Sequence, residues 1–476
     1  MAGWMRAVVV GTVVVAAVVV VAVPGAVAPT AQRPAAAAGP TPPTSAPPEP
    51  PPGRNPTAPR TPSPNPPPDR PLPQPGVPPG LDLAPLPFPQ QFPGAQPGAP
   101  WVVSLGDSFI SGEAGRWAGN TDKDSSRTDA LGATAYFDSP DGTRELIPLC
   151  HRSKSAMIHI VDDGSPDQPG APVNSLNLAC SGAQTVTMTS SGAFKPGLDF
   201  FNADPAHQGQ ALMLQEFAAA HDVRLVEVSI GGNDFAFAPI VTACVEDYLV
   251  YDSLCSKQAG VLAEVNADAV TRVTANITTA LQNVRTAMRN AGKADGSWTL
   301  VFNLNPDPLA NGGDFRYPQN YNRQLVGGCG FWDADATWAS TELISIIRKA
   351  QLDAIARAGI TPTHILDLGE LLDARELCVR GTELVGTSRG AKTWKSPDAV
   401  DVSEWANQIH LQTVTGPYFQ QESLHPNYWG QLAARSCVRQ IYAAGDVRSG
   451  TCVRAGSGLT GRGEPAMTLA NQAPLP

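Results

Sequence analysis

The sequence predicts an α/β fold in which a mostly parallel sheet is covered by helices on both faces. Short apolar runs alternate along the chain with longer segments that have helical periodicity. Continuous apolar runs are typical of strands buried on both faces, and helices usually connect such strands. The runs also end at turn-forming residues, such as Gly106 and the pair Gly231-Gly232.

The expected strands and helices alternate along the chain. Strands are predicted at Trp101–Leu105, Leu176–Ala179, Leu225–Ile230, Thr299–Leu304 and Thr363–Leu368. Helices are predicted at Gln210–His221, Val265–Ala291, Ala336–Ala358 and Tyr428–Ala443. In sheets of this kind, ligands bind beyond the carboxyl ends of the strands. The residues directly after each strand are therefore the first candidates for a functional site.

The amino terminus predicts an export signal. Arg6 precedes a mainly apolar run from Ala7 to Val23, which Pro24 and Gly25 interrupt. The sequence Ala-Val-Ala at 26–28 then fits the small-x-small pattern of a signal-peptidase site. The alternative is an uncleaved anchor, because the run approaches the length of a membrane span. Either interpretation predicts a protein that is secreted, or held at the cell surface or cell wall.

Residues 29–100 predict a disordered, proline-rich linker. Of the 47 prolines in the chain, 28 lie between Pro29 and Pro100. Such a segment cannot bury enough apolar surface to offset its ordering entropy, and it favours extended polyproline II. A spacer is the favoured role, and a proline-rich ligand is the alternative. The predicted organisation is a signal peptide (1–28), the linker (29–100), a folded domain (101–455) and a C-terminal tail (456–476).

Charge and cysteine content restrict the class of protein. The formal net charge is −10, which argues against a nucleic-acid partner, and the 42% hydrophobic content excludes a fully disordered chain. An even number of cysteines in an exported chain predicts disulfides. No CxxC pair or Cys/His cluster has zinc spacing, so no metal site is expected. Pairing in sequence order is the simplest of many connectivities for Cys150, Cys180, Cys244, Cys255, Cys329, Cys378, Cys437 and Cys452.

Residues with the chemistry of a serine hydrolase lie at the ends of the predicted elements. Such an enzyme needs a nucleophilic hydroxyl, an imidazole base and donors to the developing oxyanion. Ser108 offers a hydroxyl and its own N–H, and His425, before the last helix, offers the base. Gly182 offers a second N–H, and Asn233 offers a side-chain amide. Each signal is weak alone, but the four together predict a catalytic site.

The motifs around these residues resemble the GDSL/SGNH hydrolases. The stretch Ser104–Glu113 (SLGDSFISGE) is similar to the first block of that family, and most similar to its exported actinobacterial esterases and lipases. Gly182 matches the second block, Gly231–Asp234 (GGND) the third and His425 the fifth. Cys150–Ser153 (CHRS) also resembles a segment common in that branch. The blocks occur in family order over about residues 101–445.

The resemblance implies a flavodoxin-like, three-layer α/β/α sandwich at 101–455, stapled by disulfides that pair in sequence order. It implies hydrolysis of esters through an acyl-enzyme on Ser108, with His425 as the base. The oxyanion hole would comprise Ser108, Gly182 and Asn233. The expected partner is an ester substrate, either an acyl lipid or an acetylated carbohydrate. Neither a metal nor an organic cofactor is implied, and the linker would hold the domain near the cell wall or membrane surface.

One position departs from the family pattern. The family commonly has an aspartate three residues before the histidine, and here that residue is Glu422. A glutamate carboxylate can orient an imidazole, but some actinobacterial relatives use a main-chain carbonyl, so both arrangements stay open. Two alternative functions also remain, an extracellular O-acyltransferase and a non-catalytic, wall-associated module on the same fold. The intact Ser108, Gly182, Asn233 and His425 argue against the second.

Other signals are interpreted as structural. Residues 386–390 (GTSRG) match a G-x-S-x-G nucleophile elbow with Asp401 downstream, but Pro397 and the short remaining chain favour a surface loop. Asp122, Asp124 and Asp129 lack the glycine and glutamate of a calcium loop, which favours a solvated loop. Two further sets complete the candidates. The histidines given no role are His151, His159, His207, His221, His364 and His410. The tryptophans considered for a substrate groove are Trp117, Trp332, Trp394 and Trp405, whereas Trp338 is expected in the core.

Overall fold

The computed structural model describes residues 8–10, 19–21, 95–160, 172–189, 193–387, 389–411, 417–442 and 446–471. Contacts divide the chain into two units, and one of them, Pro24–Leu83, lies wholly outside the described residues. So do most of the predicted linker and the predicted cleavage site. Near the amino terminus, β1 (Val8–Val10) pairs antiparallel with β2 (Val19–Val21). Within the described part of the chain, no helix is long and apolar enough to cross a membrane.

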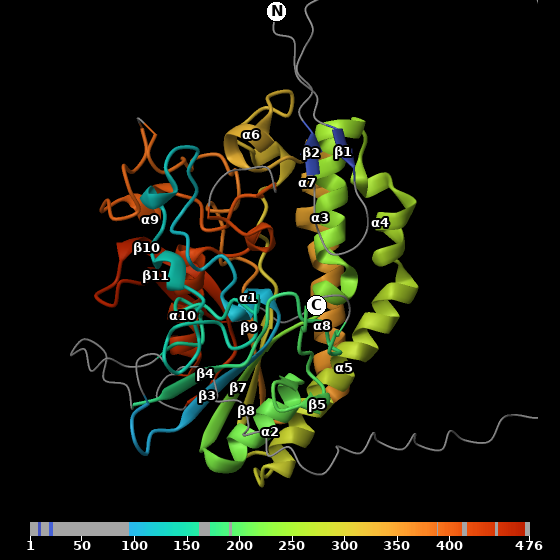
Figure 1. Cartoon of the computed structure of the whole chain (residues 1–476), viewed down its shortest axis with the longest axis vertical. Coiled ribbons are helices and arrows are strands. Elements are labelled where there is room, and N and C mark those ends of the chain that lie inside the picture. Colours follow the sequence, from blue (N-terminus) through green and yellow to red (C-terminus); the bar gives the residue numbers. More distant parts are fainter. Residues whose placement is uncertain are drawn as a thin grey trace, which may run out of the picture. The chain divides into compact units, whose positions relative to one another are not determined.

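A seven-stranded sheet organises the fold, with strand order β11-β10-β9-β8-β7-β3-β4 (Figure 1). The neighbouring strands from β4 to β10 are parallel, whereas β11 is antiparallel to β10. The strands are β3 (Trp101–Gly106), β4 (Asn174–Asn177), β7 (Val223–Ser229), β8 (Thr299–Leu304), β9 (Thr363–Asp367), β10 (Gly450–Leu459) and β11 (Pro465–Ala470). A separate antiparallel pair comprises β5 (Asn202–Asp204) and β6 (His207–Gln208).

Helices lie on both faces of the sheet, with α2, α5 and α8 on one side and α1 and α10 on the other (Figure 1). The α-helices are α1 (Ser108–Ser111), α2 (Gln210–Ala220), α3 (Phe237–Glu246), α4 (Ala259–Glu264), α5 (Ala267–Asn290), α6 (Arg323–Gly327), α7 (Asp333–Trp338), α8 (Ile344–Ala358), α9 (Ala399–Val402) and α10 (Tyr428–Tyr442). Short 3-10 turns occur at Ser125–Arg127, Gly132–Thr134, Asn233–Phe235, Cys255–Lys257, Gly312–Asp314 and Gln420–Glu422, and π turns at Asp247–Tyr251 and Ala339–Leu343. The predicted α/β/α sandwich is confirmed, with one antiparallel strand at its edge.

The pattern of buried residues explains these layers. In α5, apolar side chains recur every three or four residues and are fully buried at Val273, Ile277, Leu281, Val284 and Met288. That spacing gives one continuous apolar stripe along a helix, and the stripe packs toward the sheet and α8. In β3, successive residues are buried alike, because both faces of the sheet are covered.

The predicted elements occur with shifted ends, and the carboxyl-terminal region differs. The single helix expected from Ala336 to Ala358 starts at Asp333 and is interrupted by a π turn. The domain boundary expected at residue 455 falls inside β10, and β11 continues the sheet to Ala470. Residues 456–459 and 465–470 thus lie in strands of the sheet rather than in a separate tail. Their half-exposed, glycine-containing sequence lacks the continuous apolar run that identifies a central strand.

Four disulfides join the cysteines in sequence order: Cys150–Cys180, Cys244–Cys255, Cys329–Cys378 and Cys437–Cys452. The predicted pairing is confirmed. The first disulfide ties the loop before β4 to the turn after it, and the last ties α10 to β10.

We expect a chain that ends at Ala455 to be less stable than one that ends at Asn471. The truncation removes β11, in which Met467 and Leu469 are buried against the sheet and α10. Burial of two such side chains contributes about 3–6 kcal/mol to the free energy of unfolding. Thermal unfolding of the two chains measures the difference, and equal melting temperatures would show that β11 adds nothing to the fold.

Candidate active site

Ser108 is the first residue of α1, in a tight turn after β3. The Asp107 carboxylate caps this helix by accepting a hydrogen bond from the Phe109 N–H at 3.2 Å. Gly106 has a φ of +138°, and a Cβ there would lie 1.9 Å from the Ser229 carbonyl oxygen on β7. Because any side chain would collide with that backbone, only glycine permits the turn that presents Ser108.

Gln210 fixes the backbone of this turn from the start of α2. Its side-chain oxygen accepts a hydrogen bond from the Gly106 N–H at 2.7 Å, and its Nε2 donates to the Gly106 carbonyl at 2.9 Å. Nε2 also donates to the Pro196 carbonyl at 2.7 Å. The Gln210 side chain is fully buried, so these bonds satisfy polar groups that have no access to water.

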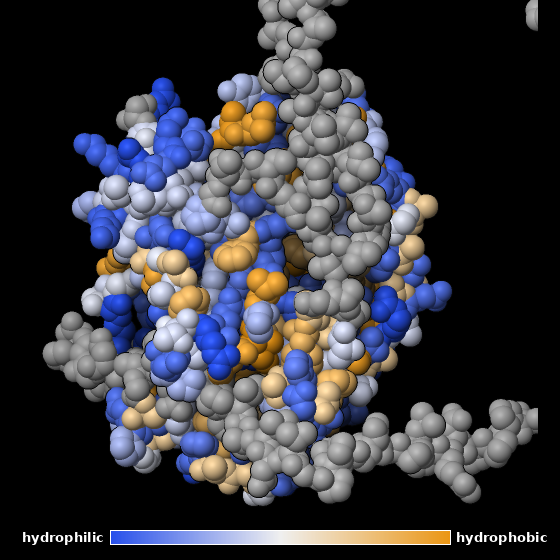
Figure 2. All heavy atoms as spheres, viewed as in Figure 1, coloured by the Kyte–Doolittle hydropathy of each residue, from blue (hydrophilic) through white to orange (hydrophobic). Residues whose placement is uncertain are grey.

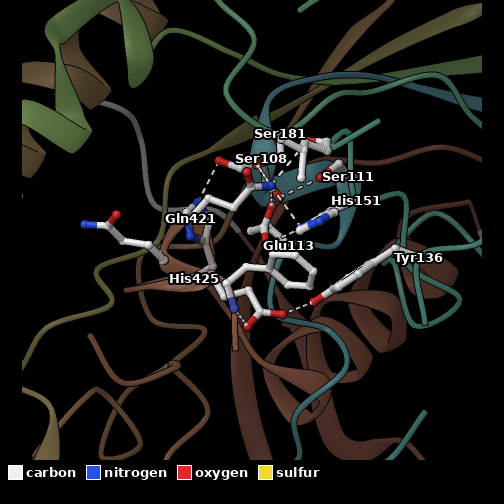
Figure 3. Close-up of polar contacts among 12 residues, drawn as sticks. Ser108, Ser111, Glu113, Tyr136, His151, Ser181, Gln421 and His425 are labelled. Atoms are coloured by element: carbon white, nitrogen blue, oxygen red, sulfur yellow. Dashed lines mark hydrogen bonds and ion pairs between the residues drawn. The ribbon is translucent and has the colours of Figure 1, made fainter. Parts of the chain in front are cut away.

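His425 lies against the Ser108 hydroxyl (Figure 3). Its Nε2 is 2.6 Å from Ser108 Oγ, and its Nδ1 is 2.9 Å from the Ser423 carbonyl oxygen. A carbonyl only accepts hydrogen bonds, so Nδ1 carries the proton and the Nε2 lone pair faces the hydroxyl. Burial lowers the pKa of His425 below its usual value. At neutral pH the imidazole is therefore neutral and can accept the Ser108 proton.

The Ser423 carbonyl, and not the Glu422 carboxylate, orients the imidazole in this structure. The Glu422 carboxylate instead accepts hydrogen bonds from the Tyr136 hydroxyl at 2.6 Å and from Trp117 Nε1 and the Phe419 N–H at 2.9 Å each. Burial raises the pKa of Glu422 to about 7. Of the two arrangements left open by the sequence, the geometry corresponds to the main-chain carbonyl.

The remaining predicted residues lie at the same end of the sheet. Gly182 follows β4 with a φ of +78°, and Asn233 begins the 3-10 turn after β7. Asn233 Nδ2 donates one hydrogen bond to the Ala183 carbonyl at 2.9 Å, which leaves its second amide hydrogen for another acceptor. The Ser108 N–H lies in the first turn of α1, where helix geometry provides it with no acceptor. Ser108, Gly182, Asn233 and His425 all line one cavity.

That cavity continues as an apolar groove with a volume of about 550 Å³. One wall carries Phe237, Val241, Val245 and Leu249, each four residues after the last, along α3 and the adjoining π turn. Residues four apart lie on one face of a helix, so these side chains form a track that leads away from Asn233. The lining also includes apolar side chains from other segments: Leu149, Ile409, Leu411, Tyr418 and Phe419. Figure 2 shows apolar side chains near the centre of the face viewed.

Several sequence candidates lie elsewhere. Within the described residues, the groove lining contains none of the five tryptophans, and Trp117, Trp338 and Trp405 are buried in the interior. Asp401 pairs with Arg454 instead of facing His425, and Ser388 lies outside the described residues. The three aspartates considered for calcium have separate roles: Asp129 pairs with Arg116, Asp124 caps a 3-10 turn, and Asp122 pairs with Lys123. In the part of the chain that the structure describes, no cluster of acidic, histidine or cysteine side chains could hold a metal ion.

A buried pair beside the site could not be identified from the sequence. His151, to which no role was given, has its Nδ1 2.8 Å from Glu113 Oε1, and both side chains are fully buried. Glu113 lies in the SGE segment after the nucleophile, and His151 in the CHRS segment. Both segments carry the family resemblance, and each contains a titratable residue, Glu113 or His151. That was the only sequence signal for the pair.

Comparisons with known proteins identify structural neighbours only. No protein-family model and no curated protein matches the chain. One similar solved structure is an extracellular lipase from Streptomyces rimosus, with 17% identity and a TM-score of 0.35 over 72% of this chain and 100% of that one. Another is a phospholipase A1 from Streptomyces albidoflavus, with 17% identity and a TM-score of 0.38 over 73% of this chain and 100% of that one. A family two carbohydrate esterase from Clostridium thermocellum also matches, with 11% identity and a TM-score of 0.30 over 73% of this chain and 65% of that one. These neighbours are esterases and lipases, as the sequence resemblance predicted. At such low identities and TM-scores, the function has to be inferred from the chain's own geometry.

Glu422→Gln is expected to reduce ester hydrolysis by less than about tenfold, because removal of the carboxylate from a true triad costs about 10⁴ in turnover. The variant should also unfold at a lower temperature, since Glu422 accepts three buried hydrogen bonds. Steady-state kinetics on a soluble ester, with a melting curve, separate the two effects. A loss of turnover near 10⁴ in a folded variant would instead mean that the Glu422 carboxylate acts as the third member of a triad.

Proposed function

We propose that this chain is an exported serine esterase that hydrolyses carboxylic esters with an apolar acyl chain. The observation that carries the proposal is the 2.6 Å contact between Ser108 Oγ and His425 Nε2 at the head of the apolar groove. A nucleophile and a base within hydrogen-bond reach, next to a cavity with oxyanion donors, are the elements of acyl transfer.

The proposed reaction has two steps. Ser108 Oγ attacks the ester carbonyl carbon while His425 Nε2 accepts the hydroxyl proton, and the carbonyl oxygen becomes an oxyanion. The backbone N–H groups of Ser108 and Gly182 and the free amide hydrogen of Asn233 stabilise that charge. The C–O bond to the alcohol then breaks, and His425 returns the proton to the leaving alcohol. Water attacks the acyl-enzyme in the same way, which releases the acid and restores Ser108.

The groove supports an acyl lipid over an acetylated carbohydrate as the substrate class. The track on α3 offers aliphatic and aromatic side chains at every turn from Phe237 to Leu249. Each methylene buried there contributes about 0.8 kcal/mol to binding, whereas an acetyl group would leave most of the track empty. The predicted export signal and the four disulfides support a location outside the cytoplasm, and the predicted linker would hold the domain near the cell wall or membrane surface.

Purified protein is expected to hydrolyse p-nitrophenyl esters, with higher kcat/KM for octanoate to palmitate than for acetate. Ser108→Ala should lower activity at least about 10³-fold, because the substitution removes the nucleophile. Full activity in this variant would mean that Ser108 is not the nucleophile. Absence of turnover on every ester would favour the acyltransferase or the non-catalytic module.

Val241→Trp is expected to shift this preference toward short chains. Val241 lies four residues after Phe237, the first residue of α3, which places it about 6 Å along the helix axis from the start of the track. An indole at that position would block the track, so kcat/KM for palmitate should fall by at least about tenfold, whereas that for butyrate should change little. Leu262→Trp, an exposed position on α4, is the control. An unchanged chain-length profile in Val241→Trp would show that acyl chains do not bind along α3.

A further inference from the structure

A buried ion pair that the proposed reaction does not use lies beside the catalytic residues. Figure 3 shows Glu113, His151 and Gln421 close to Ser108 and His425. Glu113 Oε1 is 2.8 Å from His151 Nδ1, and the His151 ring stacks on Tyr136 at 4.1 Å between ring centroids. Isolating two charges from water costs several kcal/mol per ion, so a buried pair is weak evidence for stability alone. Its position next to the site therefore requires another explanation.

Glu113 connects the segments that carry the catalytic groups. Its backbone N–H donates to the Ser108 carbonyl at 3.1 Å, which ties it to the nucleophile turn. Its Oε2 accepts a hydrogen bond at 2.9 Å from Nε2 of Gln421, four residues before His425. Its partner His151 follows Cys150, whose disulfide with Cys180 leads to Gly182. One carboxylate thus contacts or adjoins all three segments.

The transition state needs a negative charge near His425. When the imidazole accepts the Ser108 proton it becomes a cation, and in a triad a carboxylate at Nδ1 stabilises that cation. Here Nδ1 faces the neutral Ser423 carbonyl instead. Glu422 is bound to other donors, and its pKa of about 7 leaves it partly protonated at neutral pH.

Glu113 carries that charge. Burial alone would raise its pKa, but the charge and hydrogen bond of His151 lower the pKa of Glu113 to about 2, so it is ionised at neutral pH. Burial is the main influence on His425 and lowers its pKa, and the charge of Glu113 is the next largest and raises it. The charge of His151 acts on His425 in the opposite sense, but more weakly.

We propose that Glu113 is a positioning residue that supplies the negative charge which stabilises the His425 imidazolium, in place of a triad carboxylate. His151 holds that carboxylate and moderates its charge. The inference rests on the proposed function of Ser108 and His425.

Other titratable groups face this cluster and must be separated from Glu113. On the loop that carries His151, Glu145 Oε1 is 3.6 Å from His151 Nε2. Glu422 faces Glu113 from the Gln420–Glu422 turn, and its carboxylate accepts a hydrogen bond from the Tyr136 hydroxyl. The Lys195 ammonium donates to the Leu149 carbonyl at 2.6 Å. It faces Glu113 and Glu145 from the segment between β4 and β5. All of these groups stay in place when only Glu113 or His151 is substituted.

The test uses two substitutions that remove the charge of Glu113, one directly and one through its partner His151. Glu113→Gln keeps the shape and removes the charge, so the pKa of His425 should fall and the acidic limb of the kcat/KM profile should move to lower pH. On the plateau, kcat should fall at least about tenfold with little change in KM, because the lost charge acts on proton transfer. His151→Gln removes the partner that keeps the buried Glu113 ionised, so the pKa of Glu113 should rise and, because the charge of Glu113 acts on His425 more strongly than that of His151, the pKa of His425 should fall here too. Glu113→Asp should recover part of the activity.

A direct titration keeps the test independent of turnover. The ring resonances of the seven histidines can be followed by NMR against pH, and His425 is identified by its loss in His425→Gln. Glu464→Gln, which removes a buried carboxylate paired with Arg439 on α10, is the matched control and should leave the His425 titration unchanged. The proposal holds only if the pKa of His425 falls in both Glu113→Gln and His151→Gln and is unchanged in Glu464→Gln. Any other result overturns it, and failure of ester hydrolysis with the expected NMR shifts would instead reject the proposed function.

Discussion

The close approach of β3 to β7 at Gly106 is the constraint on which the candidate site depends. With a Cβ excluded by the Ser229 carbonyl, the chain turns at once into α1 and presents Ser108 at the end of the sheet. The Cys180 N–H donates to the Gly106 carbonyl at 3.0 Å, so the turn after β4 is held against the same glycine. Asn233 comes after β7, the neighbour of β3 on the other side. The proposed nucleophile and oxyanion donors thus follow three adjacent parallel strands, whose register fixes their mutual positions.

His425, the proposed base, lies on a loop and not directly after a strand of the sheet, so its position needs other support. His425 lies on a loop before α10, where the Asn407 carbonyl accepts a hydrogen bond from the Leu424 N–H and the Asn407 N–H donates to the His425 carbonyl at 2.8 Å. The polar side chains around this loop are hydrogen-bonded in two groups: the Tyr136 hydroxyl donates to Glu422, and Gln421 donates to Glu113. Buried polar networks hold a defined geometry when their members are satisfied. Such a network can bring a loop residue to within hydrogen-bond distance of a nucleophile on the sheet.

Features that depend on local pattern could be predicted from the sequence, whereas contacts between distant segments could not. Ser108, Gly182 and Asn233 come after buried strands, so topology alone places them together. The role of Glu422 could not be predicted, because it depends on Trp117 and Tyr136, which are distant in sequence.

The partner of His151 was missed for the same reason, because Glu113 lies in another segment of the chain. The edge strands β10 and β11 were missed because their half-exposed, glycine-containing sequence lacks a continuous apolar run. Loop tryptophans were considered for the groove, but the large rings of Trp117 and Trp405 fill the interior. The groove lining comes instead from a four-residue repeat on α3, which a helical apolar stripe in the core would resemble.

The groove and the base share a segment of chain, and this links substrate binding to catalysis. Tyr418, Phe419 and Gln421 line the groove a few residues before His425, and Gln421 also donates to Glu113. An acyl chain packed against this wall would bury apolar surface on the segment that orients the imidazole. Binding energy from a remote part of a substrate can in this way help to order the reacting groups. An acetyl group would be too short to pack against Tyr418 and Phe419 when its carbonyl lies at Ser108. An acetyl ester could therefore react at Ser108, but its binding would not help to order the segment that carries His425. In the proposed esterase, we therefore expect this arrangement to favour long acyl chains through turnover as well as through affinity.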